Sequence, residues 1–199
     1  MYIPSLTIFE TRFSFIKNDI LRINIAIAFR YVFFLLDLTE DKSSTLPGSI
    51  IYSLYKDIIL YTATIIESCI HYCLKEYVDK GKVKSADIMP EEWKEKDIKE
   101  LYSISETEKI CAITKKLGHQ RFSHQTQFIV INRAALKAKI FDRELFEKAK
   151  KLRQKRNHIH LAALKEVDDY YEKKDVQEAF DDAKEIIQQI ERKLLELEK

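Results

Sequence analysis

Hydrophobic residues recur at helical spacing along most of this chain and predict long helices joined by few loops. The first helical region starts near residue 5 and becomes apolar on nearly every side between Ile23 and Leu38, which suits a central position in a core. The second long run extends from Ser49 to Val78 and is followed by Lys80-Gly81, a common signal for a helix C-terminus. Pro47 and Gly48 mark the loop between the two runs.

Helix-start signals continue through the middle of the chain. Pro90 precedes two glutamates and predicts a helix beginning there, while Ser105 and Glu108 have capping-box spacing before the short run ICAITKKLG, which ends at Gly118. The segment QFIVINRAALKAKI, residues 127–140, is also predicted to be helical, with a brief strand as the alternative.

The last third of the chain predicts two further helices. Asp142 is a candidate cap for a helix over residues 143–164, and Asp175 with Glu178 is a candidate capping box for a final helix that reaches nearly to the C-terminus. The predicted fold class is therefore all-α. We expect a single domain over residues 1–199, a bundle of four or more core helices, with an additional helical insertion around residues 82–140.

Composition narrows the class of protein. Only 3 Gly and 3 Pro among 199 residues argue against an all-β fold and against disorder. A net charge of +2, from 34 basic and 32 acidic residues, does not indicate a nucleic-acid binder by itself. The most apolar stretch, Ile23–Leu38, is too short for a membrane span and contains Arg30 and Asp37. With no signal-peptide pattern, we expect a soluble cytoplasmic protein.

One segment, KAKKLRQKRNHIHL at residues 148–161, concentrates residues that can carry chemistry. At about 100° per residue, Arg153, Arg156, Asn157 and His160 fall within an arc of roughly 100°. That arc continues the apolar stripe, so these four polar side chains stand where a helix ordinarily presents hydrocarbon to the core. His158 points to the opposite face.

Such a placement needs a physical reason. Burying guanidinium, amide and imidazole groups without partners costs several kcal/mol, so these groups are expected in a polar cleft, at an interface or around an anion. Six of the ten residues from 148 to 157 are Lys or Arg, which makes a local basic patch. The lysines expected to contact a phosphate backbone are Lys148, Lys150, Lys151 and Lys155.

The segment LRQKRNHIHL resembles the signature helix of the HEPN superfamily, small all-α domains of prokaryotic toxin–antitoxin and antiviral systems. The family pattern is an arginine, often followed by a polar residue, then four to six residues and a histidine. Arg153 with six residues before His160 fits the pattern. Arg153 with four residues before His158 fits by spacing but places the two side chains on opposite faces. Arg156-Asn157 resembles the Arg-polar pair but stands only three residues before His160, so the motif arginine stays open.

The second long run adds to the resemblance. The sequence IIESCIHYCLKEY around Glu67 is similar to the second core helix of HEPN domains, which often carries an acidic residue facing the site. Glu67 and His71 share the apolar side of this helix, and a carboxylate there calls for a cationic partner such as Arg153 or Arg156.

The resemblance implies a metal-independent endoribonuclease that acts by attack of the RNA 2′-hydroxyl, at a site formed by two copies in a homodimer. His160 would transfer protons, the arginines would bind phosphate, and Asn157 would orient the histidine or hold a phosphate oxygen. Neither a metal nor a cofactor is expected. The partners would be RNA and, in some relatives, an antitoxin or a nucleotidyltransferase.

Two alternatives remain open at this stage. The first is a non-catalytic HEPN-like module that binds RNA or a nucleotide, or acts as a scaffold. The second is a helical interaction protein in which the arginines pair with Glu67 or aspartates and leave no accessible cleft.

Overall fold

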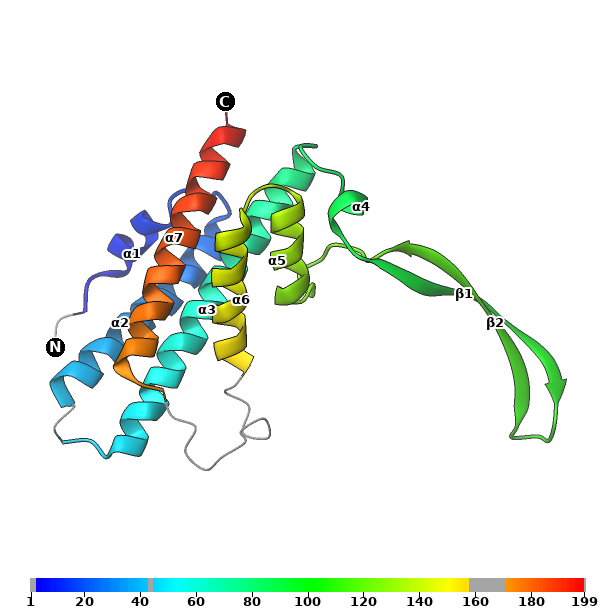
Figure 1. Ribbon diagram of the computed structural model, residues 1–199, viewed down its shortest axis with the longest axis horizontal. Helices are drawn as coiled ribbons and strands as arrows, with labels where there is room; N and C mark the ends of the chain where they lie inside the picture. Colours follow the sequence, from blue (N-terminus) through cyan, green and yellow to red (C-terminus); the bar gives the residue numbers. More distant parts are fainter. Residues whose placement is uncertain (1–2, 43–44, 158–170, 199) are drawn as a thin grey trace.

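The computed structural model describes residues 3–42, 45–157 and 171–198. The described part of the chain is mostly helical and contains one two-stranded antiparallel sheet (Figure 1). The elements are α1 (Leu6–Arg12), α2 (Asp19–Lys42), α3 (Gly48–Asp79), α4 (Ser85–Ile88), β1 (Glu91–Ser103), β2 (Lys109–His119), α5 (Phe128–Lys137), α6 (Arg143–Asn157) and α7 (Lys173–Leu197).

Helix α3 is the centre of the bundle. It packs against α2, α5, α6 and α7, and its Ile58, Ile66 and Leu74 are completely buried. The sequence predicted its limits to within one residue. The expected central role of residues 23–38 is wrong, because α2 packs mainly on α1 and α3 at one side of the bundle.

The first predicted helix is interrupted. Residues 13–18 separate α1 from α2, and Phe13 and Ile16 in this connection are fully buried. The Asn18 side-chain oxygen accepts a hydrogen bond from the backbone N–H of Leu21 at 2.9 Å. Asn18 therefore supplies an N-terminal cap for α2, a start signal that the apolar periodicity obscured.

Residues 91–119 form a β-hairpin instead of helices, so the all-α prediction is wrong for this segment. Trp93 pairs with Leu117 and Ile98 pairs with Ile113 across the two strands. Cross-strand pairs of aromatic and β-branched side chains stabilise a sheet, whereas an isolated short helix has no such contacts. The helical insertion expected at 82–140 is thus only partly helical, in α4 and α5.

The predicted capping box at Ser105 closes the turn of this hairpin. Its side-chain oxygen accepts from the backbone N–H of Thr107 at 3.2 Å and of Glu108 at 3.1 Å. The Glu108 carbonyl accepts in turn from the N–H of Ile104 at 2.9 Å. Elsewhere a local hydrogen bond of this kind begins a helix. In this hairpin it ends one strand and starts the next.

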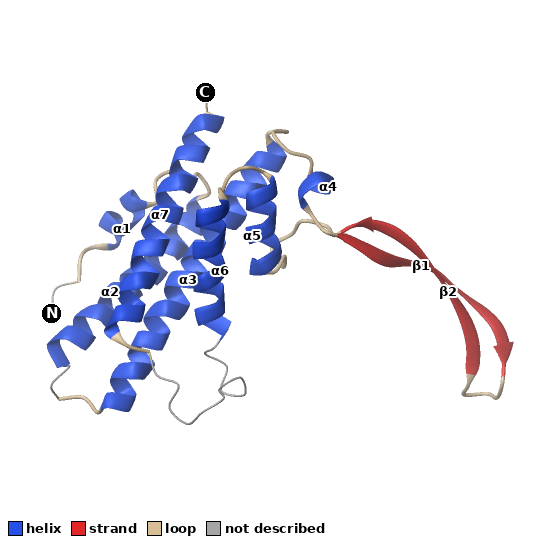
Figure 2. Ribbon diagram, viewed as in Figure 1, coloured by secondary structure: helices blue, strands red, loops and turns tan. Residues whose placement is uncertain are grey.

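The hairpin projects away from the helices (Figure 2). Its strands pair with each other and neither packs extensively on a helix. At its base, the Gln120 N–H donates to the Pro90 carbonyl at 2.8 Å, which brings the two ends of the hairpin together. The hairpin is therefore an appendage of a bundle that completes its core without it.

This arrangement predicts that the bundle folds without the hairpin. Replacing residues 91–119 with two glycines is expected to change the free energy of unfolding by less than about 1 kcal/mol, because the deletion exposes no core residue and closes a short loop. Urea denaturation followed by circular dichroism measures this. A loss of several kcal/mol would show that the hairpin contributes to the core.

The remaining helices follow the sequence closely. Asp142 caps α6, accepting from the Leu145 N–H at 2.9 Å as predicted. Helix α7 begins two residues before Asp175, with a reciprocal capping box between Glu172 and Asp175 in place of the predicted Asp175–Glu178 box. Helix α5 is confirmed, and it packs on both α3 and α6 as part of the bundle.

Among the described residues, one helix, α3, is long and apolar enough to cross a membrane by length and composition. A third of its most apolar window is buried inside the bundle (33%), so the helix is compatible with a soluble protein.

Candidate functional site

Helix α6 presents its buried face at a different angle from the one predicted. The buried residues are Leu145, Ala149 and Leu152, and Arg156 continues this series at the next turn. The inward face is therefore centred near Arg156, about 60° around the helix axis from Arg153. Arg153 lies at the edge of this face, and Asn157 is exposed.

Arg156 joins α6 to the central helix. Its guanidinium Nη1 donates to Glu67 Oε2 on α3, and the side chains are only 30% and 24% exposed. The guanidinium carbon also lies 5.9 Å from the ring centre of Phe128 on α5. The predicted partnership between Glu67 and an arginine of this segment is confirmed, and the arginine is Arg156.

Arg153 is the arginine available for a ligand. It is half-buried and has no carboxylate partner among the described residues. It stands one turn before Arg156, in the last turns of α6. A phosphate that binds its guanidinium would break no ion pair among the described residues.

His160, the histidine predicted to transfer protons, lies outside the described residues, and so does His158. The described chain stops at Asn157 and resumes at Tyr171, and a hydrogen bond joins the two sides of this gap. The Tyr171 hydroxyl donates to the backbone carbonyl of Lys155 at 2.7 Å. Such a bond satisfies a carbonyl that the end of a helix leaves without an intrahelical partner.

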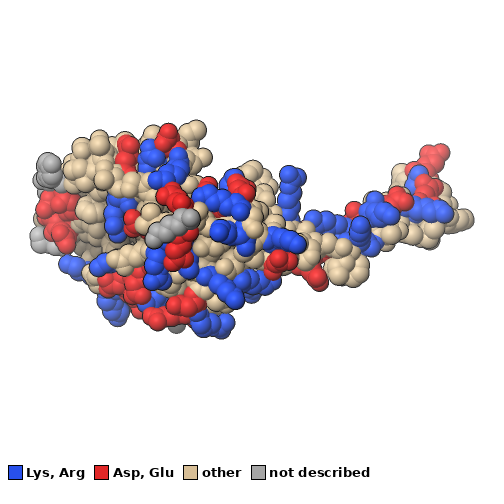
Figure 3. Space-filling model, turned by 90° about the horizontal axis from the view of Figure 1, so that it is seen from above, with Lys and Arg blue, Asp and Glu red and all other residues tan. Residues whose placement is uncertain are grey.

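The four lysines predicted to hold an RNA backbone all form ion pairs with carboxylates. Lys148 pairs with Glu144 and Glu185, and Lys150 pairs with Glu147 at 2.7 Å. Lys151 and Lys155 both pair with Glu178 on α7. The basic patch seen in the sequence is thus largely neutralised by α7 and by α6 itself, and Figure 3 shows Lys and Arg interspersed with Asp and Glu over the bundle.

Lys155 is the most enclosed of these lysines. Its Nζ lies 3.0 Å from Asp175 Oδ1 and 2.8 Å from Glu178 Oε2. Burial by itself lowers the pKa of Lys155, but these two hydrogen bonds outweigh it and raise the pKa above its ordinary value. The hydrogen bonds from Lys151 and Lys155 lower the pKa of Glu178. Lys155 and Glu178 therefore both stay charged at neutral pH, and their ion pair fastens the end of α6 to α7.

His71 lies one turn beyond Glu67 on α3, and its side chain makes structural contacts with the loop that follows the hairpin. Its Nε2–H donates to the Ser123 carbonyl at 2.9 Å, and its ring stacks on Phe122 at a centroid distance of 4.7 Å. His71 thus holds the loop that follows the hairpin, while Glu67 holds α6. The sequence did not reveal Phe122 and Phe128 as neighbours of these residues, because no local pattern links a loop or α5 to α3.

The Glu67–Arg156 pair is expected to stabilise the bundle measurably. Glu67→Gln leaves a half-buried guanidinium without its carboxylate and should lower the free energy of unfolding by about 1–2 kcal/mol. Chemical denaturation measures the loss. Asp79→Asn, which breaks a well-exposed pair on the same helix, should cost less than about 0.5 kcal/mol and serves as the control. Equal losses in the two variants would contradict a special role for Glu67.

Among the residues that the structure describes, no three His, Cys, Asp or Glu side chains gather as a metal site. Cys69 and Cys73 are buried in α3, and burial raises the pKa of Cys69 to about 12. These thiols are therefore packing groups rather than nucleophiles.

No protein-family model matches the sequence, and neither a curated protein nor a solved structure matches the chain. The class that the structure defines is a mainly helical bundle with a projecting β-hairpin, and its candidate site is formed where α3, α5 and α6 meet.

Proposed function

We propose that this chain is a HEPN-like domain acting as a metal-independent endoribonuclease in a prokaryotic toxin–antitoxin or antiviral system. One observation carries the proposal: Glu67 on the second core helix pairs with Arg156 on the signature-like helix and leaves Arg153 without a carboxylate partner among the described residues. The resemblance of LRQKRNHIHL and IIESCIHYCLKEY to two HEPN helices requires these helices to be neighbours, and α3 packs on α6.

Arg153 and Arg156 have different roles in the proposed chemistry. Arg156 is the positioning group, because its charge is already satisfied by Glu67. Arg153, free of a carboxylate partner among the described side chains, binds the scissile phosphate and stabilises charge that develops in the transition state. His160 removes the proton of the 2′-hydroxyl or protonates the leaving oxygen. Asn157, which is exposed, contacts the phosphate or the histidine.

We further propose that the active form is a homodimer in the cytoplasm. One chain contributes one such histidine, and acid–base cleavage needs a proton acceptor and a proton donor. A two-fold axis that brings together the ends of two α6 helices supplies both. An antitoxin or a nucleotidyltransferase would act on the same end of α6.

Cleavage of RNA in the presence of EDTA tests the proposal. Wild-type protein is expected to cut RNA and leave a 2′,3′-cyclic phosphate and a 5′-hydroxyl. Arg153→Ala should lower the cleavage rate roughly 10–100-fold, the loss expected from one charge-assisted phosphate contact. Arg143→Ala, at the opposite end of α6 and paired with Glu147, should leave the rate unchanged. Absence of cleavage by wild-type protein would refute the ribonuclease proposal.

A second candidate function is a non-catalytic HEPN-like module that binds RNA or a nucleotide, or acts as a scaffold. The hairpin favours the scaffold form, because Trp93, Ile98, Ile113 and Leu117 share one face and remain 44–65% exposed. Neutralised lysines on α6 also suit a helix that binds protein more than RNA. RNA binding with a steep salt dependence and no cleavage would select the binding module. If the protein neither binds nor cleaves RNA, the scaffold function is the candidate that remains.

A further inference from the structure

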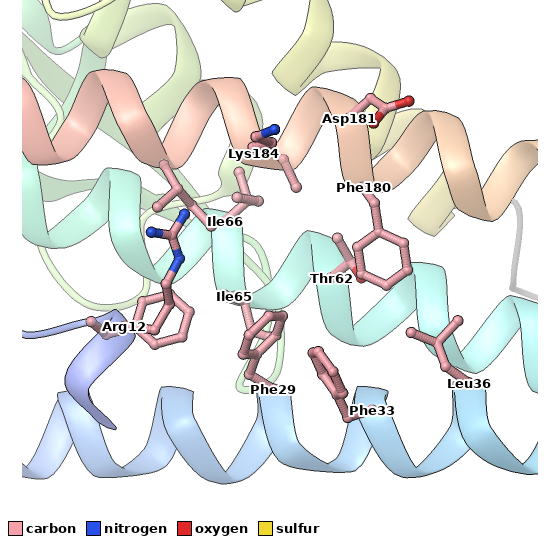
Figure 4. A pocket seen from close by; sticks show the side chains of 13 residues that line it. Arg12, Phe29, Phe33, Leu36, Thr62, Ile65, Ile66, Phe180, Asp181 and Lys184 are labelled. Carbon is pink, nitrogen blue, oxygen red and sulfur yellow. The ribbon is translucent and has the colours of Figure 1, made fainter. Parts of the chain in front are cut away.

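A second feature of the bundle lies away from α6, between α2 and α7. These two helices flank α3 with little direct contact, and a cavity of about 340 Å³ occupies the space between them (Figure 4). This volume lies within the range of small-molecule sites, which is about 300–1,000 Å³. It is roughly twice the volume of an apolar protein cavity that holds benzene.

The cavity wall is almost entirely hydrocarbon. Phe29 and Phe33 rise into it from α2, and Phe180 enters from α7 (Figure 4). Ile65 on α3 completes the floor, and the Thr62 hydroxyl is already satisfied by the Ile58 carbonyl at 2.7 Å. Because the described lining offers no unpaired buried polar atom, the part of a ligand that enters must be apolar.

The rim of the cavity carries two cations without carboxylate partners among the described residues. The Arg12 guanidinium reaches from α1 toward α7, and Lys184 lies on α7 at the edge of the cavity (Figure 4). The remaining charge at the rim is Asp181, whose oxygens accept from the Gln177 amide at 3.2 and 3.3 Å. The rim therefore keeps a net positive charge beside an apolar interior.

The space continues along the same groove. A further hollow of about 590 Å³ lies between α2 and α7 and shares Leu36 and Phe180 with the cavity. A ligand that fits both parts is longer than it is wide. Its polar end would lie at Arg12 and Lys184, and its chain would run past Phe180 toward Leu36.

We propose that this cavity binds an unbranched medium-chain carboxylate of about ten carbons, with its carboxylate at Arg12 and Lys184 and its alkyl chain among the phenylalanines. The apolar wall favours the alkyl chain of the ligand. Arg12 and Lys184, which have no carboxylate partner among the described residues, favour an anion over a neutral molecule. This site is separate from the end of α6 and does not depend on the ribonuclease proposal.

Titration calorimetry of the full-length protein with decanoate and with 1-decanol, both below their aggregation limits, tests the proposal. We expect saturable binding of one decanoate per chain, and weaker binding of decanol. Arg12→Gln and Lys184→Gln should each weaken decanoate binding about threefold to tenfold and leave decanol unchanged. Lys137→Gln, an exposed cation on α5, should have no effect.

A cavity-filling variant gives the decisive comparison. Ala183 is buried on the cavity wall, so Ala183→Leu should fill part of the space and prevent decanoate binding. An unchanged or higher melting temperature would show that this variant is folded. Decanoate binding that is absent, non-saturable, or unchanged in Ala183→Leu would overturn the proposal. Equal affinity for decanoate and decanol would overturn the assigned roles of Arg12 and Lys184.

Discussion

His160→Ala is expected to lower the rate of RNA cleavage by roughly 10²–10⁴-fold, the usual contribution of a general acid or base. The prediction depends on the sequence, since residue 160 lies outside the described part of the chain. An imidazole with an ordinary pKa of ~6.5 exchanges protons readily at neutral pH, and alanine cannot. Cleavage of a labelled RNA under single-turnover conditions in EDTA measures the rate of the chemical step.

His158→Ala is the matched control, because helical spacing assigns this histidine to the opposite face from Arg153. It should retain a rate within about threefold of wild type, far from the loss expected on removing a general acid or base. If His158→Ala lost activity and His160→Ala did not, the motif would be Arg153 with His158. Equal cleavage by wild type and His160→Ala would remove the proposed role of His160.

Ile186→Ala is expected to lower the free energy of unfolding by about 2–5 kcal/mol, the usual cost of removing a large buried aliphatic side chain. Ile186 is fully buried on α7, and the α3–α7 contact is the most extensive between helices in this bundle. A loss of this size is a large part of the roughly 5–15 kcal/mol that stabilises a typical domain. Denaturation by urea, followed by circular dichroism, measures it.

Leu195→Ala on the same helix provides the comparison. Its side chain is 50% exposed, so the substitution should cost no more than about 0.5 kcal/mol. Similar losses of unfolding free energy in both variants would mean that the buried side chains of α7 do not stabilise its packing in the bundle. Such a result would also weaken the proposed cavity, whose wall depends on the position of α7.

Local sequence was sufficient to predict where most of the helices lie. Asp142 was predicted as a cap and is one, because its side chain needs only the backbone three residues away. The limits of α3 followed from a long apolar run between a Pro-Gly loop and a Lys-Gly pair. The pairing of Glu67 with an arginine also followed, since a carboxylate on an apolar stripe requires a cation.

The same local signals were ambiguous for residues 91–119. Ser105 has the spacing of a helix cap, and its hydrogen bond to Glu108 forms as expected, yet the bond closes a hairpin turn. The choice between helix and strand rested on pairs such as Ile98 with Ile113, which are fifteen residues apart. Helical periodicity carries no information about such partners.

The sequence by itself determined where most helices lie and which residues could carry chemistry, because caps, breakers and apolar spacing act over a few neighbouring residues. Only the tertiary structure decided how α6 is rotated and which of its cations are free. Lys151 is neutralised by Glu178, 27 residues away, and Arg156 by Glu67, 89 residues away. Charges can pair across any distance along the chain once packing brings them together, so the composition of one helix could not show that Arg153 alone, among the described cations of its last two turns, lacks a carboxylate partner.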